Sequence, residues 1–176
     1  MILKQISTCI MFFFVASILG FLWEVGLLWM QEGAFLNRGF LYGPWLPVYG
    51  VGAVLIYLFL GKYEHSYIRV FFLSGLIGTG TELAVGWFLD KVWRLRYWDY
   101  SGYPMNFNGY ICLWIALGFA AAGMVWVCFA APRLKKLWWK FPHLLQRSLL
   151  TIFIVAFIFD CAAALIFPNM GKGVTY

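Results

Sequence analysis

The sequence predicts an all-α membrane protein: a polytopic bundle of five transmembrane helices with a cytoplasmic interfacial helix and an outer interfacial loop. Hydrophobic residues make up 64% of the 176 residues and charged residues only 11%, whereas soluble domains have about 45–50% and about 25%. Five apolar segments each approach the roughly 20 residues that a membrane-spanning helix needs. No segment shows the polar–apolar alternation of a transmembrane β-barrel. We therefore expect a single transmembrane domain over residues 1–176.

The expected spans follow one another with short connections, as in a bundle with antiparallel neighbours. They cover residues 6–30, 42–60, 68–90, 109–131 and 148–167. The first carries one lysine before it and no small-residue cleavage site behind it, so we expect a retained span and not a signal peptide. Small residues spaced four apart, which let helices approach closely, occur in two spans: Ser74 and Gly78, and Gly118 and Ala122.

The distribution of basic residues predicts the orientation, because cytoplasmic loops carry an excess of lysine and arginine. Five lie on the side opposite the N-terminus, and eight lie on its own side: Lys4, Lys62, Arg69, Arg133, Lys135, Lys136, Lys140 and Arg147. We expect a cytoplasmic N-terminus and an external C-terminus. The net charge of +6 is spread over short loops, which favours membrane lipids as partners and excludes nucleic acid.

Two connecting segments are expected to lie on the membrane surface. From Arg133 to Arg147, an apolar stripe of Leu134, Leu137, Trp138 and Phe141 predicts an interfacial helix whose lysines face water and anionic headgroups. The same helix could instead dock a cytoplasmic partner. On the outer side, the aromatic residues and arginines of 91–103 are typical of a belt at headgroup level.

No pattern indicates a metal or cofactor. The four cysteines lie singly in apolar segments without a CxxC pair, and His65 and His143 are isolated loop residues. We expect no cofactor and no metal.

Three acids lie inside expected spans: Glu24 in the first, Glu82 in the third and Asp160 in the fifth. An ionisable side chain at the bilayer centre costs about 2.5–3.5 kcal/mol on insertion scales, so such residues face the bundle interior. At about 1.5 Å rise per residue, all three lie roughly 9–12 Å below the outer surface, which points to one site. Two interpretations stay open: a functional site with at least two of the acids, or structural acids bonded across helices or paired with Arg38, Arg94 or Arg96.

Glu24 and Glu82 also occupy similar sequence contexts. GFLWEVG (20–26) and GTGTELAVG (78–86) each place a glutamate among glycines, and each is followed by a polar loop containing Gly and Pro. This similarity suggests a parallel internal repeat, an arrangement known among transporters. The matching segments are short, so chance similarity stays an alternative.

The second span begins with helix breakers. Pro44 and Pro47 remove backbone donors, and the glycines around them weaken helix locally. One interpretation is an irregular, substrate-facing segment whose free N–H groups, near Asn37 and Arg38, form an electropositive mouth for an anion. The other is an ordinary capped start with a proline kink.

Two sequence blocks resemble a known family. NRGFLYGPWLPVYGVGAV, from Asn37, and YWDYSGYPMNFNGYICLW, from Tyr97, are similar to blocks of the bacterial membrane proteins named "Putative ABC-transporter type IV", or CmpB-like. The resemblance covers most of Glu24 to Gly123, and it implies five spans in a bacterial cytoplasmic membrane. No GxxxxGK[ST] motif is present, so any ATPase would be a separate subunit.

The leading interpretation is a small membrane transport component or carrier with a polar site near the outer face. Asn37 and Arg38 would recruit an anionic or polar group, while the three intramembrane acids would handle protons or a cation. The other candidate binding residues come from the outer loops: Tyr42, Asp99, Tyr100, Asn106 and Asn108.

Two other functions stay open. A membrane enzyme could act on a lipid or lipid-linked substrate at the outer interface, with Glu24 or Glu82 as general base, Arg38 on a phosphate, and Tyr42, Asp99 or Tyr100 orienting the substrate. No Ser-His-Asp or Cys-His set accompanies these residues. A structural, sensory or assembly subunit is the third function. A separate partner subunit and a homo-oligomer are both compatible with the sequence.

Overall fold

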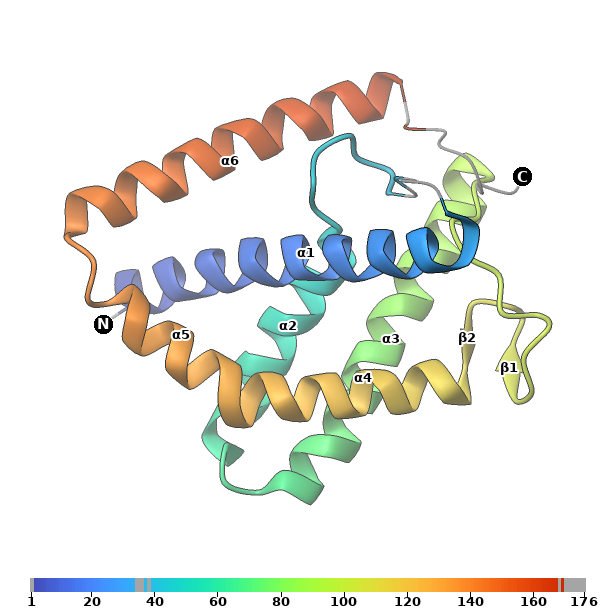
Figure 1. The fold of residues 1–176 in the computed structure, drawn as a ribbon, viewed down its shortest axis with the longest axis horizontal. Helices are drawn as coiled ribbons and strands as arrows, with labels where there is room; N and C mark the ends of the chain where they lie inside the picture. The colour runs from blue at the N-terminus through green and yellow to red at the C-terminus, as the bar shows by residue number, and fades with distance from the viewer. Residues whose placement is uncertain (1, 34–36, 38, 168, 170–176) are drawn as a thin grey trace. The chain divides into compact units, whose positions relative to one another are not determined.

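The computed structural model describes residues 2–33, 37, 39–167 and 169, and it is helical apart from one short hairpin (Figure 1). The helices are α1 (Ile2–Glu32), α2 (Pro47–Leu60) with a 3₁₀ turn (Gly61–Tyr63), α3 (Tyr67–Trp93), α4 (Leu113–Val125), α5 (Ala131–Trp138) and α6 (His143–Ile166). Strands β1 (Asn106–Phe107) and β2 (Ile111–Cys112) pair antiparallel. The predicted all-helical class is confirmed, and the hairpin is an addition to it.

Four helices of the described chain are long and apolar enough to cross a membrane: Ile2–Met30, Tyr67–Trp93, Leu113–Trp138 and His143–Ile166. They match four of the five expected spans and make the chain a multi-pass membrane protein. The expected span 42–60 differs, because its helix α2 begins only at Pro47 and has 14 residues. At 1.5 Å per residue α2 is about 21 Å long, shorter than the roughly 30 Å hydrocarbon core.

The expected interfacial helix over Arg133 to Arg147 is not a separate element. Helix α5 continues α4 through a π-helical segment (Trp126–Ala130), in which Ala131 N–H bonds the carbonyl of Trp126. Pro132 explains the irregularity, because proline lacks an N–H and its ring crowds the carbonyl four residues earlier. The basic segment therefore divides into the end of α5, a turn at 139–142 and the start of α6.

Contacts divide the described chain into two compact units. The first unit (Met1–Gly50 and Lys135–Val174) contains α1, α6 and the loop Gly39–Leu46, which we call the pre-α2 loop. Its core joins Phe14 of α1, Trp45 of the loop and Phe157 of α6, with ring centroids 5.8–6.2 Å apart. This packing fixes the pre-α2 loop against α1 and α6.

The second unit (Val51–Leu134) is built on α3 packed along α4. Small residues allow the close approach: a Cβ on Gly78 would meet the ring of Phe119, and one on Gly123 would collide with Ser74. The expectation for Ser74 and Gly78 is therefore confirmed. A Cβ on Gly118 would meet nothing within 4 Å, so Gly118 is not needed for close packing between helices.

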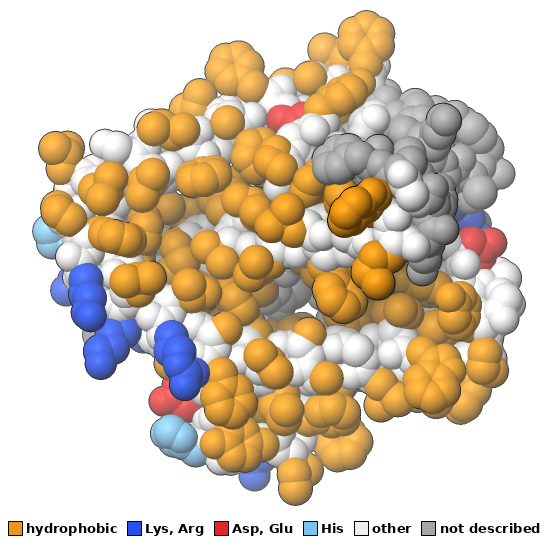
Figure 2. All heavy atoms as spheres, viewed as in Figure 1, with side chains coloured by type: hydrophobic (Ala, Val, Ile, Leu, Met, Phe, Trp, Pro, Cys, Tyr) orange, Lys and Arg blue, Asp and Glu red, His pale blue; other side chains and the backbone are white. Residues whose placement is uncertain are grey.

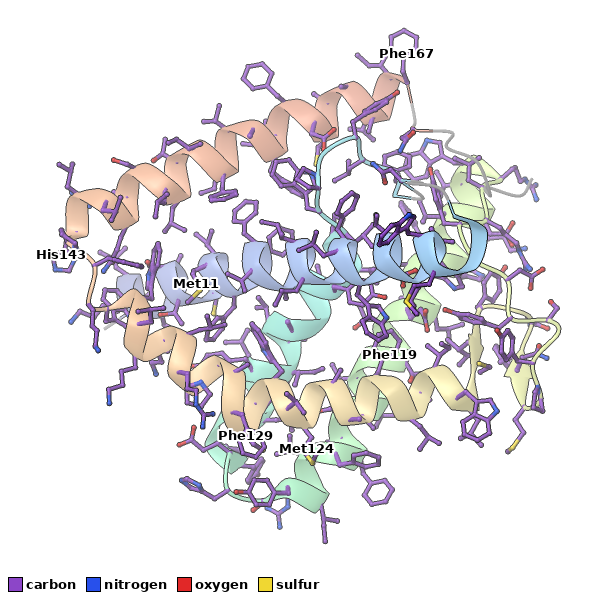
Figure 3. All side chains as sticks on the ribbon, in the orientation of Figure 1. Met11, Phe119, Met124, Phe129, His143 and Phe167 are labelled. Atoms are coloured by element: carbon purple, nitrogen blue, oxygen red, sulfur yellow. The ribbon has the colours of Figure 1, made fainter. Side chains whose placement is uncertain are left out.

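Large hydrophobic side chains remain exposed, as expected of surfaces that face lipid. They cover most of the face shown in Figure 2. Helix α6 is the clearest example, with Ile152, Ile158 and Phe159 each at least 60% exposed. In Figure 3 side chains project both above and below α6 between the labelled His143 and Phe167.

Candidate functional site

Asp160 of α6 holds the pre-α2 loop by three hydrogen bonds. Its Oδ1 accepts from the backbone N–H of Tyr42 at 3.0 Å, and its Oδ2 accepts from the N–H of Gly43 at 2.8 Å. The indole N–H of Trp45 donates to the same Oδ2 at 2.6 Å. An irregular backbone within a membrane protein needs such internal partners. Asp160 supplies them to a loop more than 110 residues away in sequence.

Asparagine side chains form hydrogen bonds with several other backbone groups of the loop. Asn37 Oδ1 accepts from Gly39 N–H at 2.8 Å, and its Nδ2 donates to the carbonyls of Leu41 and Tyr42. Asn169 Nδ2 donates to the Gly39 carbonyl at 2.9 Å. The phenol of Tyr42 donates to the carbonyl of Phe167 at 2.8 Å. Asn37 and Tyr42 are both predicted to bind a ligand, and their side chains form hydrogen bonds within the chain.

Two backbone N–H groups near the expected electropositive mouth have partners within the chain. Arg38, its expected cation, lies outside the described residues. The N–H groups of Tyr42 and Gly43 belong to the loop and not to a helical turn, since α2 begins at Pro47. They bind the chain's own carboxylate. Pro47 itself is the first helical residue, where a missing N–H costs nothing.

Glu24 of α1 accepts a hydrogen bond from the phenol of Tyr49, with 2.5 Å between Oη and Oε1. Glu24 is half-buried, and Tyr49 lies in the first turn of α2. Gly20, one turn before Glu24, makes the approach possible, because any Cβ there would overlap the Tyr49 ring. Because Gly20 has no side chain, the Tyr49 phenol can reach the Glu24 carboxylate.

Glu82 of α3 has a similar partner in the second unit. The phenol of Tyr100 donates to Glu82 Oε1 at 3.1 Å, and Glu82 is 6% exposed. Gly86, one turn later on α3, admits the ring of Trp98. Each of the two similar sequence contexts therefore places its glutamate against a tyrosine hydroxyl.

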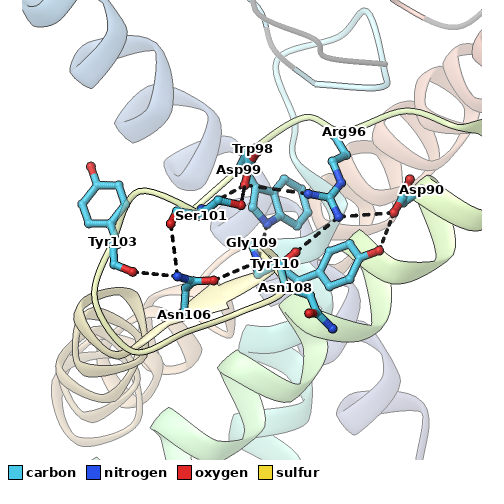
Figure 4. A network of polar contacts seen from close by, with 10 residues as sticks. All are labelled: Asp90, Arg96, Trp98, Asp99, Ser101, Tyr103, Asn106, Asn108, Gly109 and Tyr110. Carbon is cyan, nitrogen blue, oxygen red and sulfur yellow. Dashed lines mark hydrogen bonds and ion pairs between the residues drawn. The ribbon is translucent and has the colours of Figure 1, made fainter.

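The loop between α3 and α4 folds into a compact hairpin (Figure 4). Asn108 and Gly109 form its tip with φ of 50° and 74°, the positive angles that a type I′ turn requires. Asn106 holds the preceding bend by donating to the carbonyls of Ser101 and Tyr103. Within the segment 91–103, which is expected to be a surface-lying aromatic belt, Tyr97 is buried and Tyr103 is exposed.

Ion pairs and an arginine stacked on a tyrosine ring stabilise the base of this hairpin. Arg96 lies 3.4 Å from Asp90 and 3.7 Å from Asp99, and it stacks over the ring of Tyr110. The phenol of Tyr110 also donates to Asp90. The hydroxyl and N–H of Ser101 lower the pKa of the Asp99 carboxyl, and the charge of Arg96 lowers it further.

Nine of the ten predicted site residues are described, and they fall into four groups, of which Glu24 with Tyr49 is one. Tyr42 and Asn37 join Asp160 at the pre-α2 loop, Tyr100 joins Glu82, and the hairpin contains Asp99, Asn106 and Asn108. Glu24 and Asp160 belong to the first unit and Glu82 to the second. The single level shared by the three acids stays a prediction. In the described chain no group of three or more His, Cys, Asp or Glu residues is placed to hold a metal ion.

Sequence reasoning missed several partners that complete these groups. Trp45 and Tyr49 are separated from their carboxylates by 115 and 25 residues, and no local pattern relates them. Asp90 and Tyr110 were missed for the same reason. The hairpin did have a local signal, since Asn-Gly is the strongest short-range indicator of a type I′ turn.

The fold and these polar groups define a multi-pass helical membrane protein with carboxylates inside its spans. Residues 11–165 match the family described as "Putative ABC-transporter type IV", and the chain belongs to this family. The expected resemblance is confirmed, and it makes the chain a membrane protein of a transport-related family. No curated protein and no solved structure matches the chain.

Proposed function

We propose that this chain is a small transport component or carrier whose polar site uses its intramembrane glutamates. The observation that supports this most is the recurrence of one arrangement. Glu24 and Glu82 each lie on a long apolar helix and each accept a hydrogen bond from a tyrosine hydroxyl. Intramembrane carboxylates are costly and mark ion or proton pathways in many membrane proteins.

The two glutamate–tyrosine pairs suit proton or cation handling. A carboxylate can bind a proton or a cation, and a phenol can donate to the ionised form and accept from the protonated form. Glu24 is the better candidate for proton exchange, because its side chain is less deeply buried than that of Glu82. Asp160 is assigned a positioning role, since its two oxygens already accept three hydrogen bonds.

We further propose a single domain of five spans in a bacterial cytoplasmic membrane, with the N-terminus cytoplasmic and the C-terminus outside. The second span would consist of the pre-α2 loop followed by α2, because the backbone groups of the loop have internal partners. The excess of basic residues on the N-terminal side supports the orientation. An ATPase subunit or a second copy of the chain would be the partner.

Proton movement in reconstituted vesicles tests the function. Vesicles containing the full chain and an internal pH dye are given a pH gradient, with and without a panel of small organic anions and cations outside. We expect proton flux above that of empty vesicles, and a loss of at least about tenfold in Glu24→Gln or Glu82→Gln. Glu64→Gln, which makes the same change in the turn after α2, should retain the flux.

Two results would contradict this function. Equal flux in all variants would remove the glutamates from the pathway. Vesicles without any flux, together with hydrolysis of a phospholipid or lipid-linked substrate by the purified chain, would favour the membrane enzyme instead.

A further inference from the structure

One end of the first unit combines three segments that are distant in sequence: the start of α1, the end of α5 and the start of α6. The indole N–H of Trp138 donates to Ser7 Oγ at 3.1 Å, and that of Trp139 donates to Thr8 Oγ1 at 3.3 Å. The ammonium of Lys4 lies 5.3 Å from the ring centroid of Trp139. Two tryptophans therefore attach the α5–α6 turn to α1.

The turn between α5 and α6 is rigidly held. Gln146 of α6 is 4% exposed, and its amide donates to the carbonyls of Trp138 at 3.0 Å and Phe141 at 2.9 Å. Backbone bonds from Lys140 to Leu137 and from Phe141 to Trp138 complete the turn. These bonds fix the backbone from which the exposed lysines project, so less backbone freedom is lost when a ligand binds.

The positive charge at this end has no acidic counterpart nearby in sequence. Lys4, Lys136, Lys140 and Arg147 are exposed. Neither residues 1–23 nor residues 135–159, which supply this end, contain aspartate or glutamate. None of these four groups belongs to an ion pair in the part of the chain that the structure describes, so they can bind an anion from outside the chain.

Exposed apolar side chains surround these basic groups. Leu137 is 51% exposed, Phe141 38% and Leu144 78%. Figure 2 shows basic side chains gathered at one edge of the visible face with hydrophobic ones beside them. Nucleic acid or an acidic peptide would leave this apolar surface in water, whereas a lipid contacts both kinds of group.

From these contacts we propose that this end of the first unit, the Lys–Trp end, binds the phosphate of anionic phospholipid headgroups. Lys136 and Lys140 contact the phosphate, and Leu137 and Phe141 lie against the upper acyl chains. This binding is independent of the proposed transport function. It assigns the end a specific ligand class, beyond a general attraction to the membrane surface.

Lipid titration of the full chain in non-ionic detergent, followed by native mass spectrometry, tests the proposal. The probes are phosphatidylglycerol, phosphatidylcholine, inorganic phosphate and an oligoglutamate peptide. We expect wild type to bind phosphatidylglycerol at least about tenfold more tightly than phosphatidylcholine. Each basic residue near an anionic surface contributes about fivefold, so Lys136→Gln/Lys140→Gln should lose most of this preference.

A matched control is Lys91→Gln/Arg94→Gln, which removes two exposed charges next to Asp90 in the second unit and should keep the preference. Both lysines of the test variant are exposed, and circular dichroism checks that it folds. Equal binding of both phospholipids by wild type, or an equal loss in the control, would overturn the proposal. So would oligoglutamate or inorganic phosphate binding as tightly as phosphatidylglycerol, which would indicate a protein or a soluble anion as the ligand.

Discussion

Replacing Asp160 with asparagine tests whether this carboxylate positions the pre-α2 loop. The substitution keeps the shape of the side chain but removes its charge and one of its two acceptors. In its best orientation the amide oxygen takes the place of Oδ2 and still accepts from Gly43 and Trp45. The amide NH₂ then faces the N–H of Tyr42, which loses its acceptor.

The expected loss follows from these three bonds. Hydrogen bonds to a charged group contribute about 1.5–3 kcal/mol and neutral ones about 0.5–1.5 kcal/mol, so each retained bond weakens by about 1 kcal/mol. The N–H left without an acceptor costs about 1 kcal/mol, the lower end of the usual range, because Tyr42 is half exposed. We expect Asp160→Asn to lower the free energy of unfolding by about 3 kcal/mol.

Unfolding by sodium dodecyl sulfate in mixed micelles, followed by tryptophan fluorescence, measures this loss. Asp160→Ala removes all three bonds and is the graded comparison, with a larger loss than Asp160→Asn. Protease digestion of the pre-α2 loop should accelerate in the same order. A loss below about 0.5 kcal/mol for Asp160→Asn, or identical losses for the two variants, would refute the positioning role.

Three further predictions concern the second unit. Gly109→Ala should destabilise the hairpin by at least about 1 kcal/mol, because the φ of Gly109 is positive and a Cβ would collide with side chains of the loop. Gly102→Ala, the control, should be nearly neutral in the same detergent unfolding assay. Gly123→Ala should lower the free energy of unfolding, because its methyl group would overlap Ser74 of α3. Gly118→Ala has open space and better helix propensity, so it should leave the free energy of unfolding unchanged or raise it by up to about 1 kcal/mol. The lowered pKa of the Asp99 carboxyl adds stability above its unfolded pKa, and this stability is lost as pH falls through the folded pKa; Asp99→Asn should therefore reduce the acid dependence of the unfolding midpoint.

Hydropathy predicted most of the fold because the cost of exposing polar backbone in lipid acts locally along the chain. The helices around Glu24, Glu82 and Asp160 were expected within five residues of their observed bounds. Two helix ends differ from the expected span bounds for local reasons. Pro47 begins α2 five residues later than expected, and Pro132 is accommodated by a π-helical segment that joins α4 to α5.

The polar contacts were less predictable, because they join residues that are distant in sequence. Burial cost indicated that each intramembrane acid needs a partner, but it did not identify Tyr49, Tyr100 or the pre-α2 loop. Of the arginines weighed as partners, Arg96 pairs with Asp90 and Asp99, and Arg38 lies outside the described residues. The sequence therefore indicated which groups need partners, and the structure identifies them.

Infrared absorption of the carboxyl groups tests the central claim, that tyrosine-bonded glutamates bind protons, most directly. The chain is reconstituted in lipid nanodiscs and its protonated-carboxyl band is recorded as the pH is lowered. We predict that Glu24→Gln removes one component of this band and that Tyr49→Phe shifts the same component, since the phenol bonds that carboxylate. A band unchanged by both substitutions, in a chain that still folds, would contradict the claim.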